Sequence, residues 1–364
     1  MTAPVLVVAG ARPNFMKVAP VLAALREEPR VPYLLVHTGQ HYDERMSALF
    51  FEELALPKPD VELNVGSGTQ ATQTAAVLER LEAVLLEHRP RMVLVVGDVN
   101  STLAGALAAV KLGIAVAHVE AGLRSFDRTM PEEINRVVTD AVSELLFATE
   151  ESAVENLERE GVAPERVHLV GNTMIDTLQA HRERAGASRI LDRLGLEPAS
   201  YAVLTLHRPS NVDDPLTLSR MLGPIRELSA RMPVIFPVHP RTRESLRGIP
   251  EAAGARGLRF LDPLGYLDFL RLMSESRLVL TDSGGIQEET TVLGVPCVTL
   301  RDNTERPVTI RHGTNRLGGT EPEGIRKAID EALASGSVVP TPPPLWDGRA
   351  GMRIGHVLRG WLDA

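Results

Sequence analysis

The sequence predicts an α/β protein built from two doubly wound domains. Short apolar runs rich in Val, Ile and Leu alternate along the whole chain with segments whose apolar residues recur at helical spacing. Such alternation is typical of parallel sheets that are buried on both faces by helices. The runs form two groups of about five, separated by the polar stretch at residues 181–189, and a chain of 364 residues is long for a single core.

The elements can be placed in order from these patterns. The expected strands of the first group lie at residues 5–9, 33–37, 92–96, 114–118 and 167–170. Those of the second group lie at residues 201–206, 234–238, 258–261, 278–281 and 295–300. Apolar residues at helical spacing predict one amphipathic helix across residues 77–85 and another across residues 103–110.

Domain boundaries follow from the same grouping. We place the first Rossmann-like domain at residues 1–175 and the second at 176–346, with the junction between residues 171 and 200. The Pro-rich piece at residues 339–345 leads to a terminal segment, 347–364, whose helix is expected around residues 348–362 and to pack on the first domain. Two such domains facing each other would leave a deep cleft between them.

Composition excludes several classes of function. No apolar run approaches the roughly 20 residues that a bilayer span needs, so no membrane contact is expected. The net charge of −8 argues against a nucleic-acid partner, because a phosphate backbone calls for a basic face. The first residues are typical of a strand and not of a signal peptide, and Cys297 is the only cysteine, so a cytoplasmic protein with a buried, inert thiol is expected.

Ligands of open parallel sheets bind beyond the carboxyl ends of the strands. The polar residues that follow the expected strands are therefore the candidate site residues: Arg12, Asp98, Glu120, His207, Arg208, His239, Ser283 and Glu289. Asp98 and Glu120 follow consecutive strands, and two carboxylates in one pocket suit proton transfer because repulsion separates their pKa values. The alternative, in which Asp98 bonds loop amides and Glu120 pairs with Arg124, stays open. Ser101 is the expected N-cap of the following helix.

A third acidic position follows in P-E-E-I-N-R, residues 131–136. Pro131 is expected to begin a helix, which places Glu132 and Glu133 in a first turn where the helix dipole favours anions. Glu132 and Arg136 lie at i and i+4. The residues alone favour a structural ion pair between them; a third carboxylate of the site with its own orienting cation is the other interpretation.

The segment T-D-S-G-G-I-Q-E-E, residues 281–289, is typical of a phosphate-binding turn that leads into a helix. Gly284 and Gly285 would let the backbone approach an anion, and Glu289 one turn later would hold a ribose diol. The expected counter-charges and donors are Arg12, Lys17, His207, His239 and Arg306. Each of these residues could instead have no functional role, as a solvated surface cation or a hydrogen-bonded structural histidine. C-x-x-C and H-E-x-x-H are absent from the sequence, and His37 and His41 fall on a Gly-containing loop, so no metal is expected. G-x-G-x-x-G does not follow the first strand, so no nicotinamide cofactor is expected.

Eight motifs in order extend a resemblance over nearly the whole chain. They are G-A-R-P-N-F-M-K (10–17), H-T-G-Q-H (37–41), V-G-D-V-N-S (96–101), H-V-E-A-G-L-R (118–124), P-E-E-I-N-R (131–136), T-L-H-R (205–208), T-D-S-G-G-I-Q-E-E (281–289) and R-D-N-T-E-R-P (301–307). With these motifs the chain resembles the non-hydrolysing UDP-N-acetylglucosamine 2-epimerases. The resemblance implies a GT-B arrangement with the nucleotide sugar between two Rossmann-like domains, and a homodimer.

The resemblance also implies roles for the candidate residues. Asp98, Glu120 and Glu132 correspond to the catalytic carboxylates of the family, with Arg136 beside them. The residues implied on the substrate are Arg12 and Lys17 at the diphosphate and sugar, His207, Ser283, Gly284, Gly285 and Arg306 at the UDP phosphates, Glu289 at the ribose and Phe269 at the uracil. We count His207 with the catalytic group and His239 with the substrate-binding group.

The implied reaction interconverts UDP-N-acetylglucosamine and UDP-N-acetylmannosamine, and would supply cell-surface polysaccharide precursors. The C2 hydrogen is poorly acidic, so the family expels UDP from C1 with loss of the C2 proton, passes through 2-acetamidoglucal, and returns the proton on the opposite face. Alternatives are a hydrolysing epimerase, an epimerase of a modified UDP-sugar such as a UDP-2,3-diacetamido uronic acid, a GT-B glycosyltransferase, and a nucleotide-sugar sensor without turnover. No cofactor is implied.

Overall fold

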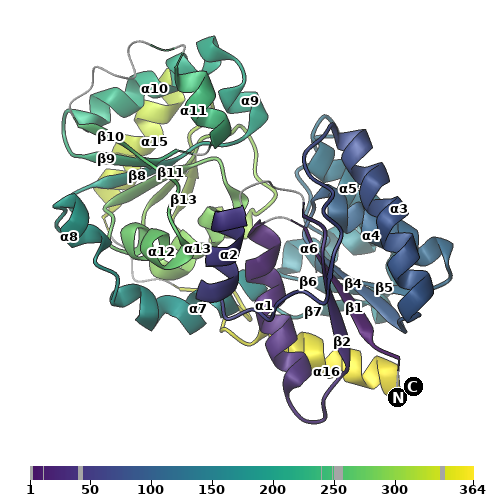
Figure 1. Cartoon of the computed structure of the whole chain (residues 1–364). Coiled ribbons are helices and arrows are strands. Elements are labelled where there is room, and N and C mark those ends of the chain that lie inside the picture. The colour runs from purple at the N-terminus through teal and green to yellow at the C-terminus, as the bar shows by residue number, and fades with distance from the viewer. Residues whose placement is uncertain are drawn as a thin grey trace. The chain divides into compact units, whose positions relative to one another are not determined.

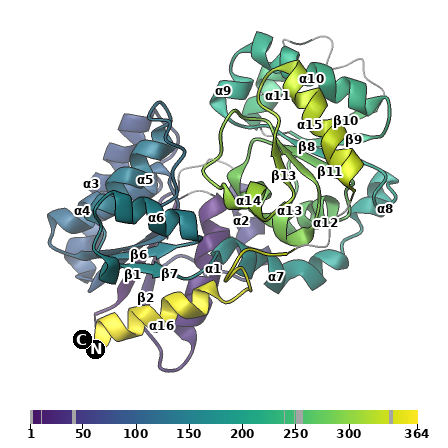
Figure 2. The same ribbon diagram turned by 180° about the vertical axis from the view of Figure 1, so that it is seen from behind.

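The computed structural model describes residues 3–10, 12–39, 44–238, 240–247, 249, 257–336 and 341–364. The chain divides into two compact units. Unit 1 comprises Met1–Ala180 together with Pro344–Ala364, and unit 2 comprises His181–Pro343. Figures 1 and 2 show the elements of both units.

Unit 1 contains a seven-stranded parallel sheet in the order β3-β2-β1-β4-β5-β6-β7. Its strands are β1 Val5–Ala9, β2 Tyr33–His37, β3 Val61–Glu62, β4 Met92–Val96, β5 Ala115–Ala121, β6 Leu145–Ala148 and β7 Val167–Leu169. Its helices are α1 Arg12–Arg26, α2 Glu44–Glu53, α3 Gln70–His88, α4 Asn100–Lys111, α5 Pro131–Val142, α6 Glu151–Arg159 and α16 Ala350–Asp363, with a 3-10 turn at Pro164–Arg166.

Unit 2 contains a six-stranded parallel sheet in the order β10-β9-β8-β11-β12-β13. Its strands are β8 Ala202–Thr205, β9 Val234–Pro237, β10 Leu258–Leu261, β11 Leu278–Thr281, β12 Cys297–Thr299 and β13 Asn315–Leu317. Its helices are α8 Ile190–Leu194, α9 Pro209–Val212, α10 Pro215–Ser229, α11 Pro240–Leu246, α12 Tyr266–Ser274, α13 Gly284–Leu293, α14 Val308–Arg311 and α15 Pro322–Ser335. Helix α7, Thr173–Gly186, contains the junction between the units.

Helices cover both faces of each sheet, as the apolar strands require. In unit 1, α3 and α4 bury one face of β1, β4 and β5, while α1 and α16 lie on the other face (Figure 1). In unit 2, α10 and α15 pack on one face of the sheet, and α12 and α13 lie on the other (Figure 2). Both sheets keep the strand order 3-2-1-4-5-6 of doubly wound folds, with one further strand at the edge of the first.

The expected fold class is confirmed, and each expected strand run contains a strand. Three strands were not predicted. β3 is only two residues long, the apolar residues of β6 follow a helix almost directly, and β13 reads N-R-L, which is too polar to stand out as an apolar run. Strand β5 runs on to Ala121 instead of ending at His118. The expectation that Ser101 caps α4 was wrong: Val99 is the N-cap, and the Ser101 hydroxyl lies 2.7 Å from that of Thr38.

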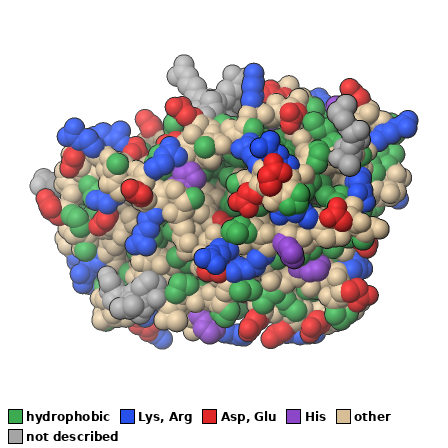
Figure 3. Space-filling model, turned by 90° about the horizontal axis from the view of Figure 1, so that it is seen from below, with side chains coloured by type: hydrophobic (Ala, Val, Ile, Leu, Met, Phe, Trp, Pro, Cys, Tyr) green, Lys and Arg blue, Asp and Glu red, His purple; other side chains and the backbone are tan. Residues whose placement is uncertain are grey.

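Cys297 is a free, buried thiol in β12, and burial raises its pKa to about 12, which agrees with an inert core residue. Among the described residues, no helix is long and apolar enough to cross a membrane. On the face shown in Figure 3, acidic and basic side chains are interspersed.

Candidate active site

Each sheet reverses its strand order once, and the candidate residues gather at these points. The reversal lies between β1 and β4 in unit 1 and between β8 and β11 in unit 2. Loops diverge there, which makes the carboxyl ends of these strands the ordinary ligand site of a doubly wound sheet. In unit 1 the residues after β1 and β4 are joined directly: the Asn14 side chain accepts from the Gly10 N–H at 3.1 Å and donates to the Val96 carbonyl at 3.0 Å.

Asp98 and Glu120 end neighbouring strands, as the sequence predicted. Strands β4 and β5 pair in register, with Val96 opposite Val119, and the Gly97 N–H donates to the Val119 carbonyl at 3.0 Å. The register of β5 against β6 shifts at Glu120, whose φ of +73° lies in the left-handed region. Such a backbone costs on the order of 1–3 kcal/mol for a residue other than glycine and persists only when its surroundings enforce it.

A lysine from α1 reaches Glu120. Lys17 forms a buried ion pair with Glu120, and both side chains are almost fully buried. The Lys17 ammonium also packs on Gly97, where an added Cβ would lie 2.8 Å from it. Lys17 is therefore not a solvated cation. The alternative pairing of Glu120 with Arg124 was wrong, since Arg124 binds Asp140 at 2.7 Å and Glu160 at 2.7 Å.

Helix α5 begins at Pro131, as predicted, and carries the third acidic position. Arg136 is 2% exposed and pairs with Asp98 and, at 2.9 Å, with Glu133. The expected ion pair between Glu132 and Arg136 was therefore wrong: the guanidinium faces Glu133 at i−3 and the end of β4. The Glu132 side chain is half-buried and makes no hydrogen bond or ion pair within the described part of the chain.

Glu133 is the structural member of the acidic pair. Its carboxylate accepts from the Ser125 N–H at 3.0 Å and the Phe126 N–H at 2.9 Å, besides Arg136. Burial opposes the charge on Glu133, but the Ser125 amide and the Arg136 guanidinium hold its pKa below the usual value. Glu133 thus fixes both the loop after β5 and the arginine that binds Asp98.

In unit 2, His207 is held by a buried aspartate. His207 Nδ1 lies 2.7 Å from Asp282 Oδ1, while the ring is 46% exposed. Asp282 also accepts from the backbone N–H groups of His207 and Arg208, the latter at 2.9 Å. Although burial raises the pKa of Asp282, His207 and these amides hold it at about 2. The Asp282 carboxylate thereby orients the partly exposed imidazole ring of His207.

The turn for which phosphate binding was expected leads into a helix, α13, as predicted. Ser283 is the N-cap, the helix begins at Gly284, and the Ser283 hydroxyl makes no hydrogen bond within the described residues. A Cβ on Gly284 would lie 2.3 Å from Arg306 Nη1, so the guanidinium lies directly on this turn. Arg306 is buried and pairs with Glu288 at 2.6 Å and Glu305 at 2.5 Å. Arg306 is therefore a fixed cation and not a solvated one.

Glu289 lies behind the same turn. It is 3% exposed and accepts a hydrogen bond of 3.0 Å from the Tyr266 hydroxyl of α12. Burial raises the pKa of Glu289 to about 8, an effect that the Tyr266 hydrogen bond partly offsets and the Glu288 charge reinforces. Phe269, on the same helix as Tyr266, is half-buried.

Two candidate residues fall outside what can be described. The backbone of Arg12 begins α1, but its side chain lies outside the described residues, as does all of His239. Within the described residues, no group of three or more His, Cys, Asp or Glu side chains could hold a metal ion.

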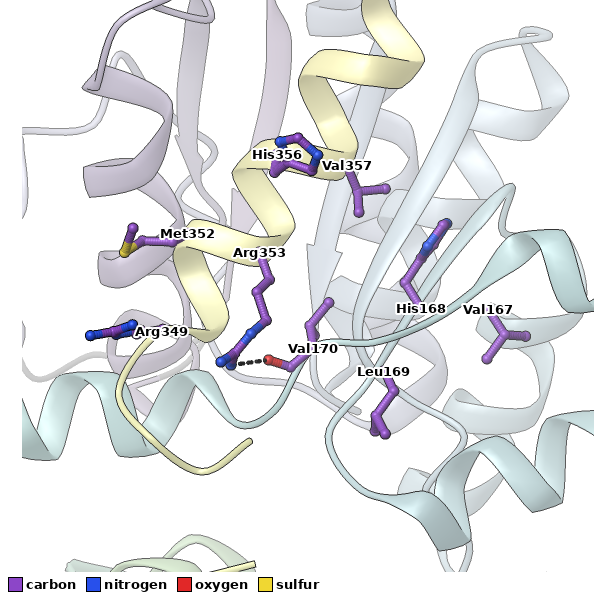
Figure 4. A pocket seen from close by; sticks show the side chains of 9 residues that line it. All are labelled: Val167, His168, Leu169, Val170, Arg349, Met352, Arg353, His356 and Val357. Atoms are coloured by element: carbon purple, nitrogen blue, oxygen red, sulfur yellow. Dashed lines mark hydrogen bonds between the residues drawn. The ribbon is translucent and has the colours of Figure 1, made fainter. Parts of the chain in front are cut away.

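A pocket of about 630 Å³ in unit 1 is separate from these groups (Figure 4). It lies between β7 and α16, and its lining includes His168, Met352 and His356 but none of the candidate site residues. Arg353, which also lines it, donates to the Val170 carbonyl at 3.0 Å and pairs with Asp347. The pocket therefore does not belong to the candidate active site.

The sequence analysis did not identify the residues that bind and orient the candidate site residues. Asp282 orients His207, and Glu305 gathers Arg301 at 2.7 Å and Arg306. In unit 1, Asp140 and His118 lie beneath the turns that carry Asp98 and Glu120. Of these, Asp282, Glu305 and His118 offered a signal, because they lie inside motifs that were already singled out, whereas Asp140 lies outside them.

Two Rossmann-like units with parallel sheets place the chain in the GT-B-like class of α/β proteins. The crystal structure of Methanocaldococcus jannaschii UDP-GlcNAc 2-epimerase in complex with UDP-GlcNAc and UDP is similar, with a TM-score of 0.93 and 42% identity over 98% of this chain and 99% of that one. A family model described as UDP-N-acetylglucosamine 2-epimerase matches residues 23–359. The chain belongs to the UDP-N-acetylglucosamine 2-epimerase family.

Two further relatives are similar over nearly their whole length. A UDP-N-acetylglucosamine 2-epimerase of Methanococcus maripaludis is 43% identical over 97% of this chain and 98% of its own. A UDP-2,3-diacetamido-2,3-dideoxy-D-glucuronate 2-epimerase of Pseudomonas aeruginosa is 41% identical over 97% of this chain and 99% of its own.

Proposed function

We propose that the protein epimerises UDP-N-acetylglucosamine at C2 to UDP-N-acetylmannosamine, reversibly, and without releasing free sugar. The observation that carries the proposal is the placement of Asp98 and Glu120 on neighbouring strand ends, each paired with its own buried cation, Arg136 and Lys17. Family membership and the names of the relatives support the same activity.

In the proposed reaction, one carboxylate removes the C2 proton while the C1–O bond to UDP breaks. The electron pair of the C2–H bond forms the C1=C2 double bond of 2-acetamidoglucal, and the oxygen of UDP leaves with the C1–O pair. UDP then returns to C1, and another carboxylate delivers a proton to the opposite face of C2. We assign these transfers to Asp98, Glu120 and Glu132, since proton transfer by placed carboxylates contributes typically about 10²–10⁴-fold to a rate.

The leaving group is assigned to cations and helix amides. His207, Ser283 and the first N–H groups of α13 at Gly284 and Gly285 would hold the UDP phosphates, since a helix N-terminus stabilises anions. The remaining assigned contacts are Arg306 at the phosphates, Glu289 at the ribose, Phe269 at the uracil, and Arg12, Lys17 and His239 at the diphosphate and sugar. The reaction is redox-neutral and the proposal includes no cofactor; a cytoplasmic homodimer supplying polysaccharide precursors is the proposed setting.

Proton NMR of UDP-N-acetylglucosamine incubated with the protein in heavy water tests the proposal. We expect the anomeric signal of UDP-N-acetylmannosamine, deuterium at C2 and no accumulating free sugar. Free UDP with N-acetylmannosamine would establish a hydrolysing enzyme instead. Turnover of the diacetamido uronic acid nucleotide alone would move the substrate to that of the Pseudomonas relative.

Variants link the exchange to the site. Asp98→Asn should lower the rate of C2 exchange by about 10²-fold or more, because the amide cannot take up the proton. Glu155→Gln is the matched control: it removes a carboxylate from an exposed pair with Arg159 in the same unit and should leave exchange unchanged. Normal exchange in Asp98→Asn would remove Asp98 from the mechanism.

A further inference from the structure

A buried cluster lies beneath the two strand ends that carry Asp98 and Glu120. We call it the His118 cluster; its members are His118, Arg124 and Asp140, which are 0%, 3% and 1% exposed. His118 Nδ1 lies 2.6 Å from Asp140 Oδ1, and Arg124 Nη1 lies 2.7 Å from Asp140 Oδ2. Buried charges lower the stability of a protein unless each is paired, so loss of one member would leave its partners unpaired and would be strongly destabilising.

The cluster forms hydrogen bonds with the backbone of both turns. His118 Nε2 lies 2.8 Å from the Gly97 carbonyl, one residue before Asp98, and since a carbonyl only accepts, the ring N–H donates this bond. The Gly122 N–H, two residues after Glu120, donates to Asp140 Oδ2 at 3.0 Å. One carboxylate therefore connects the turn of β4, through the imidazole, to the turn of β5.

The backbone of these turns needs contacts from neighbouring residues to keep its conformation. Gly97, Glu120 and Gly122 have φ values of +69°, +73° and +81°. Only glycine adopts a left-handed backbone without steric cost, so Glu120 would relax if its neighbours released it. Gly122 is held from its other side as well, because its carbonyl accepts from Asn156 at 2.9 Å.

The charge of Asp140 is essential to this arrangement. Burial alone would raise the pKa of Asp140, but His118 and Arg124 lower it, so the carboxylate stays ionised and accepts from His118, Arg124 and Gly122 together. Arg124 has a second partner, Glu160, whose side chain is 37% exposed and, among the described residues, hydrogen-bonds only to Arg124. The contacts of the cluster are to backbone groups of the turns and not to the side chains of Asp98 or Glu120.

We propose that Asp140 and His118 are positioning residues for the C2 proton transfers: they act on the substrate only by fixing the turns that aim Asp98 and Glu120. The inference rests on the proposed function. A displacement of about 1 Å in a reacting group can cost about 10²-fold in rate, so the cluster controls turnover from outside the substrate site.

Asp140→Asn, His118→Leu and Glu160→Gln in the full-length protein test the proposal. Asp140→Asn should lower kcat for epimerisation about 10²-fold and change KM and the Kd of UDP by less than about 3-fold. His118→Leu should do the same while leaving the Asp140 bonds to Arg124 and Gly122. Glu160→Gln, which also removes a carboxylate from Arg124 but touches neither turn, should stay within about 2-fold of the unmodified enzyme in kcat.

Crystal structures of the variants give a readout that does not depend on turnover. We expect the Glu120 backbone to leave the left-handed region, or Asp98 to separate from Arg136, in Asp140→Asn but not in Glu160→Gln. Unchanged turns, an unchanged kcat, or a loss seen only in KM and UDP affinity would each overturn the proposal. If Asp140→Asn does not fold, His118→Leu decides by the same criteria. Failure of the unmodified protein to exchange the C2 proton would reject the proposed function, while the positions of the turns in the variants still decide whether the cluster holds them.

Discussion

Adjacent glutamates at the start of α5 have opposite surroundings. Glu133 is 1% exposed and accepts hydrogen bonds from Ser125, Phe126 and Arg136, whereas Glu132 is half-buried. One residue along a helix turns the side chain by about 100°, which is enough to move a carboxylate from the interior toward the surface of the helix. Glu133 is therefore structural, and Glu132 stays available for the catalytic role that we propose for it.

Glu133→Gln should lower the free energy of unfolding by about 3 kcal/mol, because it leaves the buried Arg136 without one of its charged partners. Glu132→Gln should change it by less than about 0.5 kcal/mol while lowering kcat about 10²-fold or more. Urea unfolding and C2-exchange assays on both variants measure the two quantities. Equal stability losses would show that Glu132 is also structural.

Glu289 predicts a pH-dependent stability. Its folded pKa of about 8 lies above the ordinary value of 4.5, so between these values the folded protein holds a proton that the unfolded chain has lost. Stability from this group is therefore complete below about pH 4.5 and falls by on the order of 1 kcal/mol per pH unit as the pH rises toward 8.

Glu289→Gln removes this dependence, because the neutral amide can still accept from Tyr266. Its stability relative to the unmodified protein should increase steadily from pH 5 to pH 8, as measured by urea unfolding at fixed ionic strength. Glu331→Gln replaces an exposed carboxylate of the same unit. Its free energy of unfolding should change with pH in the same way as that of the unmodified protein. A constant difference between Glu289→Gln and the unmodified protein would contradict the prediction.

At the scale of the element, α16 is capped by a residue distant in sequence. Its own N-cap, Arg349, makes no side-chain cap hydrogen bond. Instead the buried Asp176 of α7 accepts from the Ala350 N–H at 3.1 Å and the Gly351 N–H at 2.7 Å. The terminal helix thus begins where unit 1 supplies the acceptor that its first turn lacks.

Asp176→Ala should lower the free energy of unfolding by about 1–2 kcal/mol, and Asp176→Asn by less, because an amide oxygen still accepts. Tryptophan emission during urea unfolding measures this, since both tryptophans, Trp346 and Trp361, lie in the segment that follows Pro343. A larger loss in the Asn variant than in the Ala variant would contradict the capping role.

At the scale of the whole molecule, unit 1 is assembled from two stretches of chain. The segment from Pro344 onward belongs to it, with Trp346 1% exposed and donating to the Thr149 carbonyl at 2.9 Å. Helices α16 and α1 approach closely at Gly351, where an added Cβ would lie 2.6 Å from the Pro20 carbonyl oxygen. Backbone cannot yield as a flexible side chain does, so this contact requires glycine.

Gly351→Ala should destabilise unit 1 by about 1–3 kcal/mol through overpacking and leave the hydrogen-exchange protection of unit 2 unchanged. Gly360→Ala is the matched control on the same helix, because a Cβ there meets nothing within 4 Å. It should be neutral or stabilising by about 0.5–1 kcal/mol, since alanine favours a helix over glycine. Loss of protection in both units with Gly351→Ala would show that they unfold together.

Much of the fold could be predicted from the local pattern of apolar and polar residues in the sequence. Apolar runs and helical spacing predicted the two parallel sheets, because a strand buried on both faces must be apolar wherever it lies in the chain. The same reasoning placed Asp98, Glu120 and Ser283 just after strand ends, at the edge where open parallel sheets ordinarily bind ligands. Short or polar strands such as β13 were missed because their pairing partners, and not their own residues, make them strands.

The partners of the charged residues depended on the tertiary structure. Arg136 has carboxylates at i−3 and i−4, and only the position of β4 decides that it pairs with Glu133 and Asp98 and leaves Glu132. Lys17 finds Glu120, and Asp140 finds His118 and Gly122, through contacts between segments far apart in the chain. The sequence by itself determined the sheets and the edge at which the acids lie, since periodicity is local; packing decided which acids are neutralised and which face the site, since an ion pair depends on distance in space.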